Sequence, residues 1–380
     1  MNPLLAAVFL ADRRLRAGIV IATLAALPAC GSCGSREEVG PTSTAVGRTI
    51  AAGLAGAIER SAALGEPFRC AELAGAAGAA AGPGAELGRR TGRALSFDGD
   101  WLRMGPAEVG RDHTLVAGVV ADARGASVAT LTQLGRVRAA FERERVEIVV
   151  SLGGMGTSEE ELTQVLGALA RDAPWVVWAI PGEREGIPAH RAAVASLSVA
   201  GYPVFDATRI RMVEVDGAVL ASFPGAAEAS RLLAGSDGCV HRPEDASALA
   251  LRLRAQKAVR VWAGHSPPRQ SDDDAGDVAL GGVHVGERAL AAALPAARPH
   301  LVLHGMVDEA ALGRASGHAS MGDGNGATVL GTGPVEAMPI TGPDGAVFAG
   351  AALVVRANAG AGEITWRRVR FPLGGSVSAR

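Results

Sequence analysis

The chain has 380 residues, of which 48% are hydrophobic, and its formal net charge is −2. This length allows one large domain or two small ones, and the apolar content supports a sizeable core. The nearly neutral charge argues against the strongly basic surface that binds nucleic acid, so no nucleic-acid partner is expected. Arginine carries almost all of the positive charge, since Lys257 is the one lysine in the sequence.

The N-terminus has the pattern of a secretory signal. A basic segment at residues 13–16 precedes an apolar run, Ala17–Leu27, which is too short to span a bilayer comfortably as a mature helix. The run leads into "LPAC" at residues 27–30. This ending resembles a bacterial lipobox, which implies cleavage after residue 29 and attachment of diacylglycerol to Cys30. An ordinary signal peptide or a membrane anchor is the alternative interpretation.

We therefore predict a lipoprotein signal peptide over residues 1–29 and a mature protein held at the cell envelope by a lipid anchor. Gly31, rather than an aspartate, follows the lipidated cysteine. By resemblance to the sorting rule of Gram-negative lipoproteins, this favours the outer membrane, facing the periplasm or the surface. Residues 30–111 are predicted to form a polar tether and an Ala/Gly-rich N-terminal region, in which Ile50–Leu64 has helical periodicity.

The remaining cysteines predict one disulfide and one free thiol. If Cys30 carries the lipid, then Cys33, Cys70 and Cys239 are left, and the sequence alone does not decide which two of them pair. Their spacing does not indicate a zinc site.

From residue 112 onward, strand-like and helix-like segments alternate, and this alternation indicates βαβ units in an α/β fold. Working groups in such sheets lie beyond the carboxyl ends of the strands. Further short strands follow, with a hairpin turn at Asp216-Gly217. We predict one domain over residues 112–371, built from two sheets with helices outside, and a tail over 372–380. The predicted early elements are strands at 114–122, 146–154 and 174–182 and helices at 131–146 and 157–172.

The residues that follow these strands resemble the signatures of calcineurin-like metallophosphoesterases. In chain order they are "ADARG" (121–125), "LGGMG" (152–156), "PGERE" (181–185), "AGHSPP" (263–268) and "HGMVDE" (304–309). The resemblance covers roughly residues 112–370 and depends on order, spacing and shared glycines, because no single motif is complete. It implies a two-sheet sandwich flanked by helices, a four-layer αββα fold. In that family, two divalent metals bridged by a carboxylate hold the phosphate that is hydrolysed.

Carried over position by position, the resemblance implies a degenerate metal site. Asp122 keeps the first carboxylate and His265 keeps an imidazole. Glu183 and Asp308 stand where other ligands are expected and still offer carboxylates. Gly154, however, stands in place of the bridging aspartate and Met306 in place of a histidine.

Two arginines stand at positions where the family pattern has histidines. Arg124 stands at a ligand position and Arg184 at the position of the catalytic histidine. A guanidinium has no lone pair to offer a metal and stays protonated, so neither arginine can act as a ligand or a general acid. The prediction is a charge network, with Arg124 and Arg184 placed among Asp122, Glu183, Glu185 and Asp308.

The sequence thus favours a pseudo-phosphoesterase: a lipid-anchored envelope protein without catalytic residues, used for binding or scaffolding with an envelope protein partner. No cofactor is expected beyond at most one weakly bound divalent metal. One alternative is a metal-dependent phosphoric ester hydrolase with a single-metal site at Asp122, Glu183, His265 and Asp308. The other is a phosphate-binding or anion-binding module in which Arg124 and Arg184 grip the anion.

Overall fold

The computed structural model describes residues 67–74, 91–105, 114–233, 237–271, 275–279, 282–308, 310, 316–320, 326–341, 345, 347–372 and 378–379. The chain divides into two units, Met1–Ala45 and Val46–Arg380, and every described residue belongs to the second. The predicted signal peptide, Cys30, Cys33 and the predicted helix Ile50–Leu64 lie outside the described residues. Within the described residues, no helix combines the length and the apolar character needed to cross a membrane.

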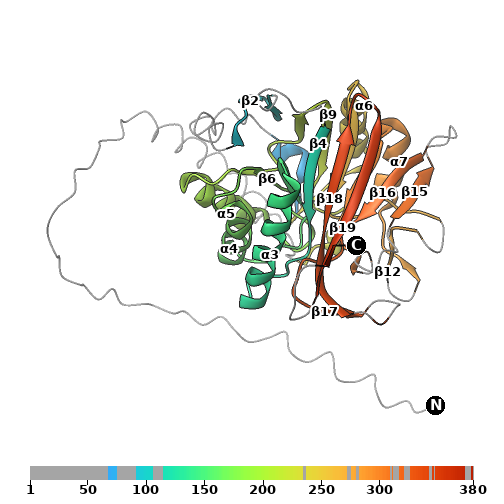
Figure 1. Ribbon diagram of the computed structural model, residues 1–380. Helices are drawn as coiled ribbons and strands as arrows, with labels where there is room; N and C mark the ends of the chain where they lie inside the picture. Colours follow the sequence, from blue (N-terminus) through green and yellow to red (C-terminus); the bar gives the residue numbers. More distant parts are fainter. Residues whose placement is uncertain are drawn as a thin grey trace, which may run out of the picture. The chain divides into compact units, whose positions relative to one another are not determined.

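The first sheet has the strand order β20-β19-β18-β4-β5-β6-β7, with β17 beside β18 (Figure 1). Its centre is parallel, because β4, β5, β6 and β7 are joined by crossover helices. The long hairpin β18–β19 is antiparallel to β4. The bounds are β4 Thr114–Val120, β5 Ile148–Ser151, β6 Val176–Ala179, β7 Val204–Asp206, β17 Pro339–Thr341, β18 Val347–Asn358, β19 Glu363–Pro372 and β20 Ser378–Ala379.

The second sheet has the order β15-β16-β14-β11-β9-β8-β3-β2. Asp216 and Gly217 have φ of +46° and +76°, so the predicted two-residue turn joins β8 to β9. The bounds are β2 Leu95–Asp98, β3 Trp101–Met104, β8 Met212–Val215, β9 Ala218–Phe223, β11 Val259–Gly264, β14 Leu301–His304, β15 Ser316–Ser320 and β16 Gly326–Gly331. Strands β2 and β3 come from residues that the sequence assigns to the N-terminal region.

Five α-helices cover the two sheets in the described part of the chain. Helix α4 begins after Ser158, whose hydroxyl caps the helix by accepting the N–H of Glu161 over 3.2 Å. The bounds are α3 Val128–Glu144, α4 Glu159–Ala170, α5 Ile187–Val199, α6 Pro243–Arg254 and α7 Arg288–Ala297. Helices α3, α4 and α5 lie together beside the first sheet in Figure 1, and α6 and α7 beside the second.

Three apolar clusters separate four layers. The central cluster joins the facing sides of the two sheets, for example Leu115 and Val119 of β4 with Leu220 of β9. A second cluster packs the other side of β4, including Val116, against Phe141 of α3. The third lies between the second sheet and helices α6 and α7. The predicted α/β two-sheet sandwich flanked by helices is therefore confirmed.

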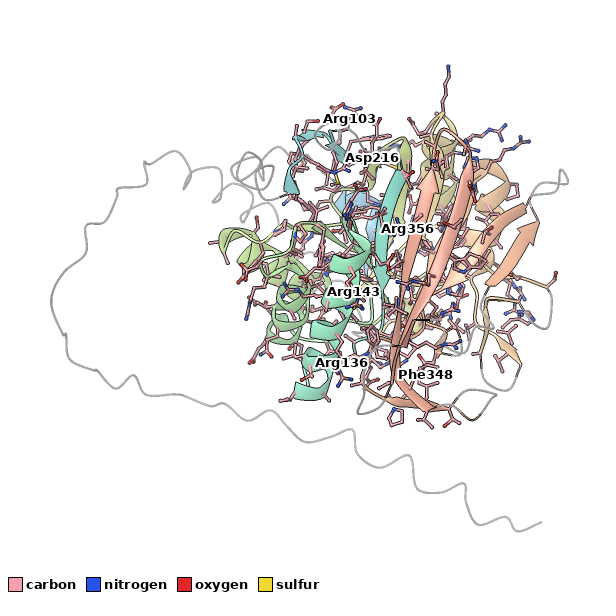
Figure 2. The ribbon with its side chains drawn as sticks, viewed as in Figure 1. Arg103, Arg136, Arg143, Asp216, Phe348 and Arg356 are labelled. Atoms are coloured by element: carbon pink, nitrogen blue, oxygen red, sulfur yellow. A yellow bond between two sulfur atoms is a disulfide. The ribbon has the colours of Figure 1, made fainter. Side chains whose placement is uncertain are left out.

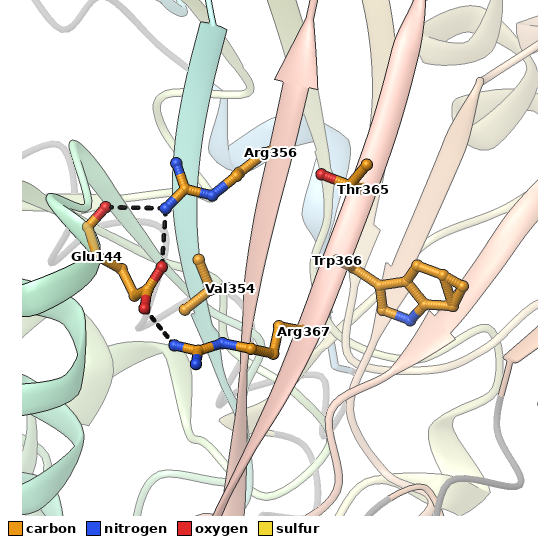
Figure 3. Close-up of a pocket in the computed structure, with 6 residues that line it drawn as sticks. All are labelled: Glu144, Val354, Arg356, Thr365, Trp366 and Arg367. Carbon is orange, nitrogen blue, oxygen red and sulfur yellow. Dashed lines mark hydrogen bonds and ion pairs between the residues drawn. The ribbon is translucent and has the colours of Figure 1, made fainter. Parts of the chain in front are cut away.

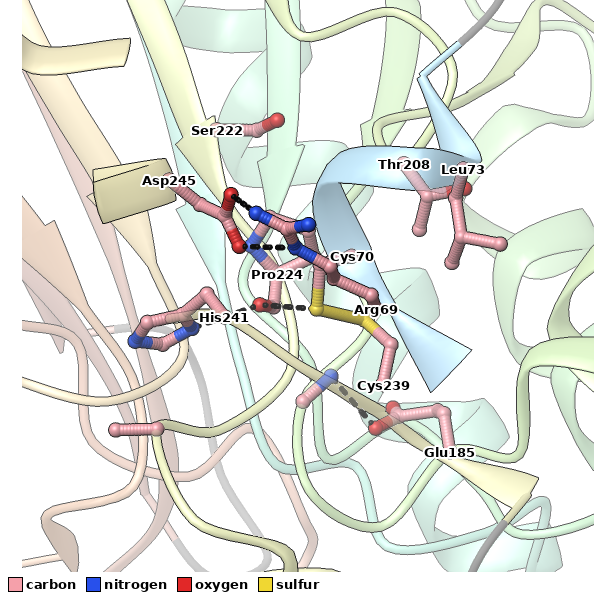
Figure 4. Close-up of a disulfide and its surroundings, with 12 residues drawn as sticks. Arg69, Cys70, Leu73, Glu185, Thr208, Ser222, Pro224, Cys239, His241 and Asp245 are labelled. Atoms are coloured by element: carbon pink, nitrogen blue, oxygen red, sulfur yellow. Dashed lines mark hydrogen bonds and ion pairs between the residues drawn. A yellow bond between two sulfur atoms is a disulfide. The ribbon is translucent and has the colours of Figure 1, made fainter. Parts of the chain in front are cut away.

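A short segment near the start of the described chain is fastened onto this sandwich. It comprises β1 (Phe68–Arg69) and the 3-10 helix Cys70–Leu73, and we name it the strap. β1 pairs in parallel with β10 (Cys239–Val240), and a disulfide joins Cys70 to Cys239 (Figure 4). This pairing selects one of the alternatives that the cysteine count leaves open.

Salt bridges also hold the strap. The guanidinium of Arg69 donates to both carboxylate oxygens of Asp245 at 2.5 and 3.0 Å. Two arginines of the domain donate to its backbone, Arg211 to the carbonyl of Cys70 and Arg191 to that of Leu73. The strap is thus part of the folded domain, although its sequence reads as part of the tether.

Candidate functional site

The predicted site residues follow strands of both sheets and converge on one edge of the sandwich. The N–H of Asp122, after β4, donates to the carbonyl of Gly153, after β5, over 2.9 Å. The two sheets meet through Met306, after β14, whose N–H donates to Oδ2 of Asp122 over 3.0 Å. His265, after β11, approaches the carbonyl of Leu152 through Nδ1 at 2.7 Å. Loop backbone and a few side chains therefore hold the strand ends together.

Asp122 and Gly154 are packed against each other without space between them. Gly154 has φ of +70°, and a Cβ atom at this position would lie 2.2 Å from Oδ1 of Asp122. No side chain fits at residue 154 unless the carboxylate moves. Asp122 itself is only 3% exposed. Burial raises the pKa of Asp122, and the positive charges of His265 and Arg124 oppose that increase.

Arg124 lies among carboxylates, as the sequence predicts. Its Nη2 donates to Oδ1 of Asp308 at 2.5 Å, and its Nη1 lies 3.4 Å from Oε2 of Glu336. Its charge also acts on Asp122. With a φ of +54° at both residues, Asp122 and Arg124 turn the chain sharply, which points the guanidinium toward the loops after β14 and β16. Arg124 is therefore already occupied by two carboxylates.

His265 and Glu183 form a second ion pair in the same site. Nε2 of His265 lies 2.8 Å from Oε2 of Glu183, and the imidazole is 1% exposed. Burial by itself lowers the pKa of His265, but the negative charges of Glu183, Asp122 and Glu185 outweigh it and raise the pKa to about 10. Burial raises the pKa of Glu183, and the charge of His265 outweighs it and lowers the pKa to about 2. The pair is an imidazolium and a carboxylate at neutral pH.

Glycines make room for this imidazole. A Cβ atom at Gly182 would lie 2.5 Å from the ring of His265, and one at Gly153 or Gly305 would lie 3.1 Å from Nδ1. The Gly153 Cβ would also overlap the backbone of Gly182. The shared glycines of the sequence pattern thus have a packing reason that is independent of any metal.

Glu185 and Arg184 depart from the predicted charge network. The carboxylate of Glu185 accepts the N–H groups of Met155 at 2.6 Å and Gly182 at 2.9 Å, so it joins two loops through their backbones. Arg184 is half-buried and makes no hydrogen bond or ion pair with any residue that the structure describes. Its charge does act on Glu161 at the start of α4. Of the two predicted arginines, only Arg124 lies among the site carboxylates.

Two further charged residues belong to the site, and the sequence did not indicate them. Glu336 follows β16 and contacts Arg124. Arg231 approaches Sδ of Met306 at 3.8 Å and donates to the carbonyl of Val285 at 2.7 Å, and its charge acts on Glu183. Glu336 lies in an irregular loop, and Arg231 is the last residue of a short 3-10 helix, Ala229–Arg231. The strand-end rule that located the other residues therefore gave no signal for them.

The donor set does not fit a pair of metals. In the described part of the chain, no group of three or more His, Cys, Asp or Glu side chains is arranged to hold a metal ion. The individual donors also have other partners: Asp122 accepts the N–H of Met306, Glu183 pairs with His265, and Asp308 pairs with Arg124. A bridging ligand is missing at Gly154, where a Cβ atom would overlap Asp122.

No family model and no curated protein matches the chain. Several solved structures are similar in fold at low identity. A protein of Thermus thermophilus, TT1561, is 11% identical with a TM-score of 0.46, and the match covers 67% of this chain and 98% of that one. A dimetal phosphatase from Danio rerio is 14% identical, with a TM-score of 0.42 and coverage of 66% and 98%.

A third similar structure is GAP50, described as the anchor in the inner membrane complex of Plasmodium. It is 11% identical with a TM-score of 0.42, and the match covers 70% of this chain and 88% of that chain. The site of this chain brings together Asp122, Arg124, Glu183, His265 and Asp308, and Arg184 forms no hydrogen bond or ion pair with these residues.

Proposed function

We propose that this protein is a catalytically inactive domain of metallophosphoesterase-like fold, anchored by lipid at Cys30 to the cell envelope, which acts by binding a partner. The observation that carries the proposal is the contact between Asp122 and Gly154. A bridging carboxylate would have to occupy the space that Oδ1 of Asp122 already fills. Without a bridge, two divalent cations would repel each other at close range, and Arg124 would add to that repulsion.

The charge pairing of the site supports the same proposal. Two cationic side chains, Arg124 and His265, neutralise Asp308 and Glu183 within the site. Each of these two carboxylates is thus already paired with a cationic side chain of the site. A metal would have to displace an arginine or an imidazolium from its carboxylate, which costs the pairing energy of that ion pair.

Metal content and turnover test this proposal together. The purified protein is loaded with manganese or zinc, desalted, analysed for metal and assayed with bis(p-nitrophenyl) phosphate. We expect no tightly bound metal pair and no turnover above that of the Asp122→Ala variant. Near-stoichiometric binding of two metals, with turnover that Asp122→Ala or His265→Ala abolishes, would falsify the proposal and favour the hydrolase.

The anchor is tested separately. Because "LPAC" precedes the predicted cleavage point, the Cys30→Ser variant is expected to leave the membrane fraction or to remain unprocessed. Membrane fractionation and intact mass of the mature protein give the answer. A variant that fractionates with membranes and has the parental mature mass contradicts lipidation at this residue.

A further inference from the structure

The first sheet carries a groove on the side that α3 covers, and this groove has the character of a binding surface. It has a volume of about 310 Å³ and lies where the C-terminal end of α3 meets β18 and β19 (Figure 3). Its lining residues are Glu144, Val354, Arg356, Thr365, Trp366 and Arg367, and the three charged side chains point toward one another while the indole of Trp366 points away from them (Figure 3). None of these residues takes part in the candidate site described above, so the groove is a separate feature of the fold.

The groove carries unbalanced positive charge. Oε2 of Glu144 accepts from Nη2 of Arg356 at 2.7 Å, and its other oxygen accepts from Arg367. One carboxylate thus serves two guanidinium groups, which remain 43% and 38% exposed. Arg136 and Arg143 of α3 lie on the same face as Arg356 in Figure 2. The surface therefore favours an anionic ligand.

The strand beside the groove has a free edge. β19 pairs with β18 along its whole length, but β20 covers only Val369 and Arg370 on the other side. Among the described residues, nothing pairs with the outer edge of β19 from Glu363 to Arg368. Unpaired N–H and C=O groups on an edge strand are a template for an added strand. The exposed indole of Trp366 lies on this stretch and offers a large apolar contact.

Charge decides what kind of strand fits there. Between Glu363 and Pro372, β19 carries three arginines and one glutamate. A second copy of β19 would itself bring three arginines and one glutamate, so it would not offset the positive charge of the groove. A strand rich in Asp or Glu would instead lie beside Arg367 of β19, with Arg356 of β18 one strand further in. The opposite charges would stabilise that pairing and accelerate the encounter.

We propose that the outer edge of β19, with the groove formed by Glu144, Arg356 and Arg367, binds an extended acidic segment of a partner protein as an added β-strand. This inference rests on the proposed binding function and names the class of partner. Glu144 acts as an internal competitor, because it holds the two arginines until an acidic side chain of the partner replaces it.

A labelled peptide of alternating Glu and Val residues is the probe, and its binding to the full-length protein is measured by fluorescence anisotropy. We expect saturable binding that weakens about tenfold or more in the double variant Arg356→Gln/Arg367→Gln. The matched control Arg136→Gln/Arg143→Gln removes the same charge from the same face and should weaken binding less than about threefold. Glu144→Gln should strengthen binding, since it frees both arginines.

Two further peptides separate strand addition from simple charge attraction. A Lys-Val peptide should not bind, and an acidic peptide with alternate backbone nitrogens methylated should bind at least about tenfold more weakly, since it cannot complete the ladder. Equal binding of the methylated peptide overturns strand addition. Equal weakening by the control pair overturns the assignment to the groove.

Other occupants give other results. If the Arg356 and Arg367 variants impair binding to phosphatidylglycerol vesicles and the acidic peptide does not bind, the surface contacts a membrane and the proposal is wrong. A dimer in sedimentation that these variants dissociate points to a second copy and likewise overturns it. The metal and turnover assays test the proposed function on the same protein preparations, and the peptide assays test strand addition at β19. A failure of one proposal is therefore distinguished from a failure of the other.

Discussion

The candidate site and the β19 groove both place cationic side chains around carboxylates, yet the two regions differ in access to water. In the site, His265 is 1% and Glu183 is 15% exposed, and Asp122 fills the space beside Gly154. In the groove, Arg356 and Arg367 share one carboxylate and stay partly exposed. Breaking a buried ion pair costs folding stability, whereas partly exposed arginines that share one carboxylate leave positive charge available to a ligand.

Removing one partner from each cluster should separate the two roles most strongly. His265→Asn leaves Glu183 without its cation and opens space between Gly153, Gly182 and Gly305, and we expect a loss of about 3 kcal/mol or more in the free energy of unfolding. Arg356→Gln in the groove should cost less than about 1 kcal/mol. Urea denaturation measures both. Similar losses for the two variants would contradict the distinction.

Gly154→Asp tests how tightly the site is closed. Overpacking against Asp122 and an unfavourable left-handed backbone together should cost about 3 kcal/mol of unfolding free energy. Gly92→Asp is the matched control, because Gly92 has φ of +64° and open space around its Cβ position. The control should lose only the backbone contribution, about 1 kcal/mol. Equal losses would show that the loop moves aside to admit a carboxylate at residue 154.

The pH dependence of stability should differ between wild type and His265→Asn. The folded-state pKa of His265, about 10, lies above its ordinary value of 6.5, so its stabilisation is complete below pH 6.5 and is lost as the pH rises toward 10. The stability difference between the two proteins should therefore shrink over that range. Urea titrations at intervals between pH 6 and pH 10 measure it. A constant difference rejects a protonated His265.

At acidic pH, the pH dependence of folding stability has the opposite sign, because it arises from a carboxylate. The folded-state pKa of Glu183, about 2, lies below its ordinary value of 4.5, so its stabilisation is present above pH 4.5 and is lost as the pH falls toward 2. Glu183→Gln should remove this part of the acid sensitivity. Acid titration followed by circular dichroism compares the variant with wild type. An identical acid midpoint for Glu183→Gln and wild type contradicts the assignment.

Much of the fold could be predicted from the sequence because the parallel strands are buried on both faces. Such strands appear as continuous apolar runs, as in β4 and β6, and each ends in a glycine or charged turn. The same rule located Asp122, Glu183 and His265, since all three follow such a run. Strands β2 and β3 were not anticipated, because they are short and partly exposed and precede the regular alternation.

The partners within the site could not be predicted from spacing alone. The sequence placed Arg184 in the charge network beside Arg124, but neighbouring residues in a turn point in different directions, and only Arg124 reaches the carboxylates. Glu185, predicted as one carboxylate of the same charge network, accepts two backbone N–H groups. The orientation of side chains in irregular loops is set by tertiary packing, which leaves no periodic trace in the sequence.

The strap has a mechanical consequence if the protein is held by its N-terminal end, as the proposed lipid anchor requires. A pull on the chain before Phe68 reaches the domain first through two residues of β1, whose few hydrogen bonds would separate easily. The covalent link from Cys70 to Cys239 then transmits the force directly across a sequence separation of 169 residues. The strands β4, β5 and β6, with the loops that follow them, lie within this closed loop. Tension applied at the N-terminal end therefore bypasses these three strands.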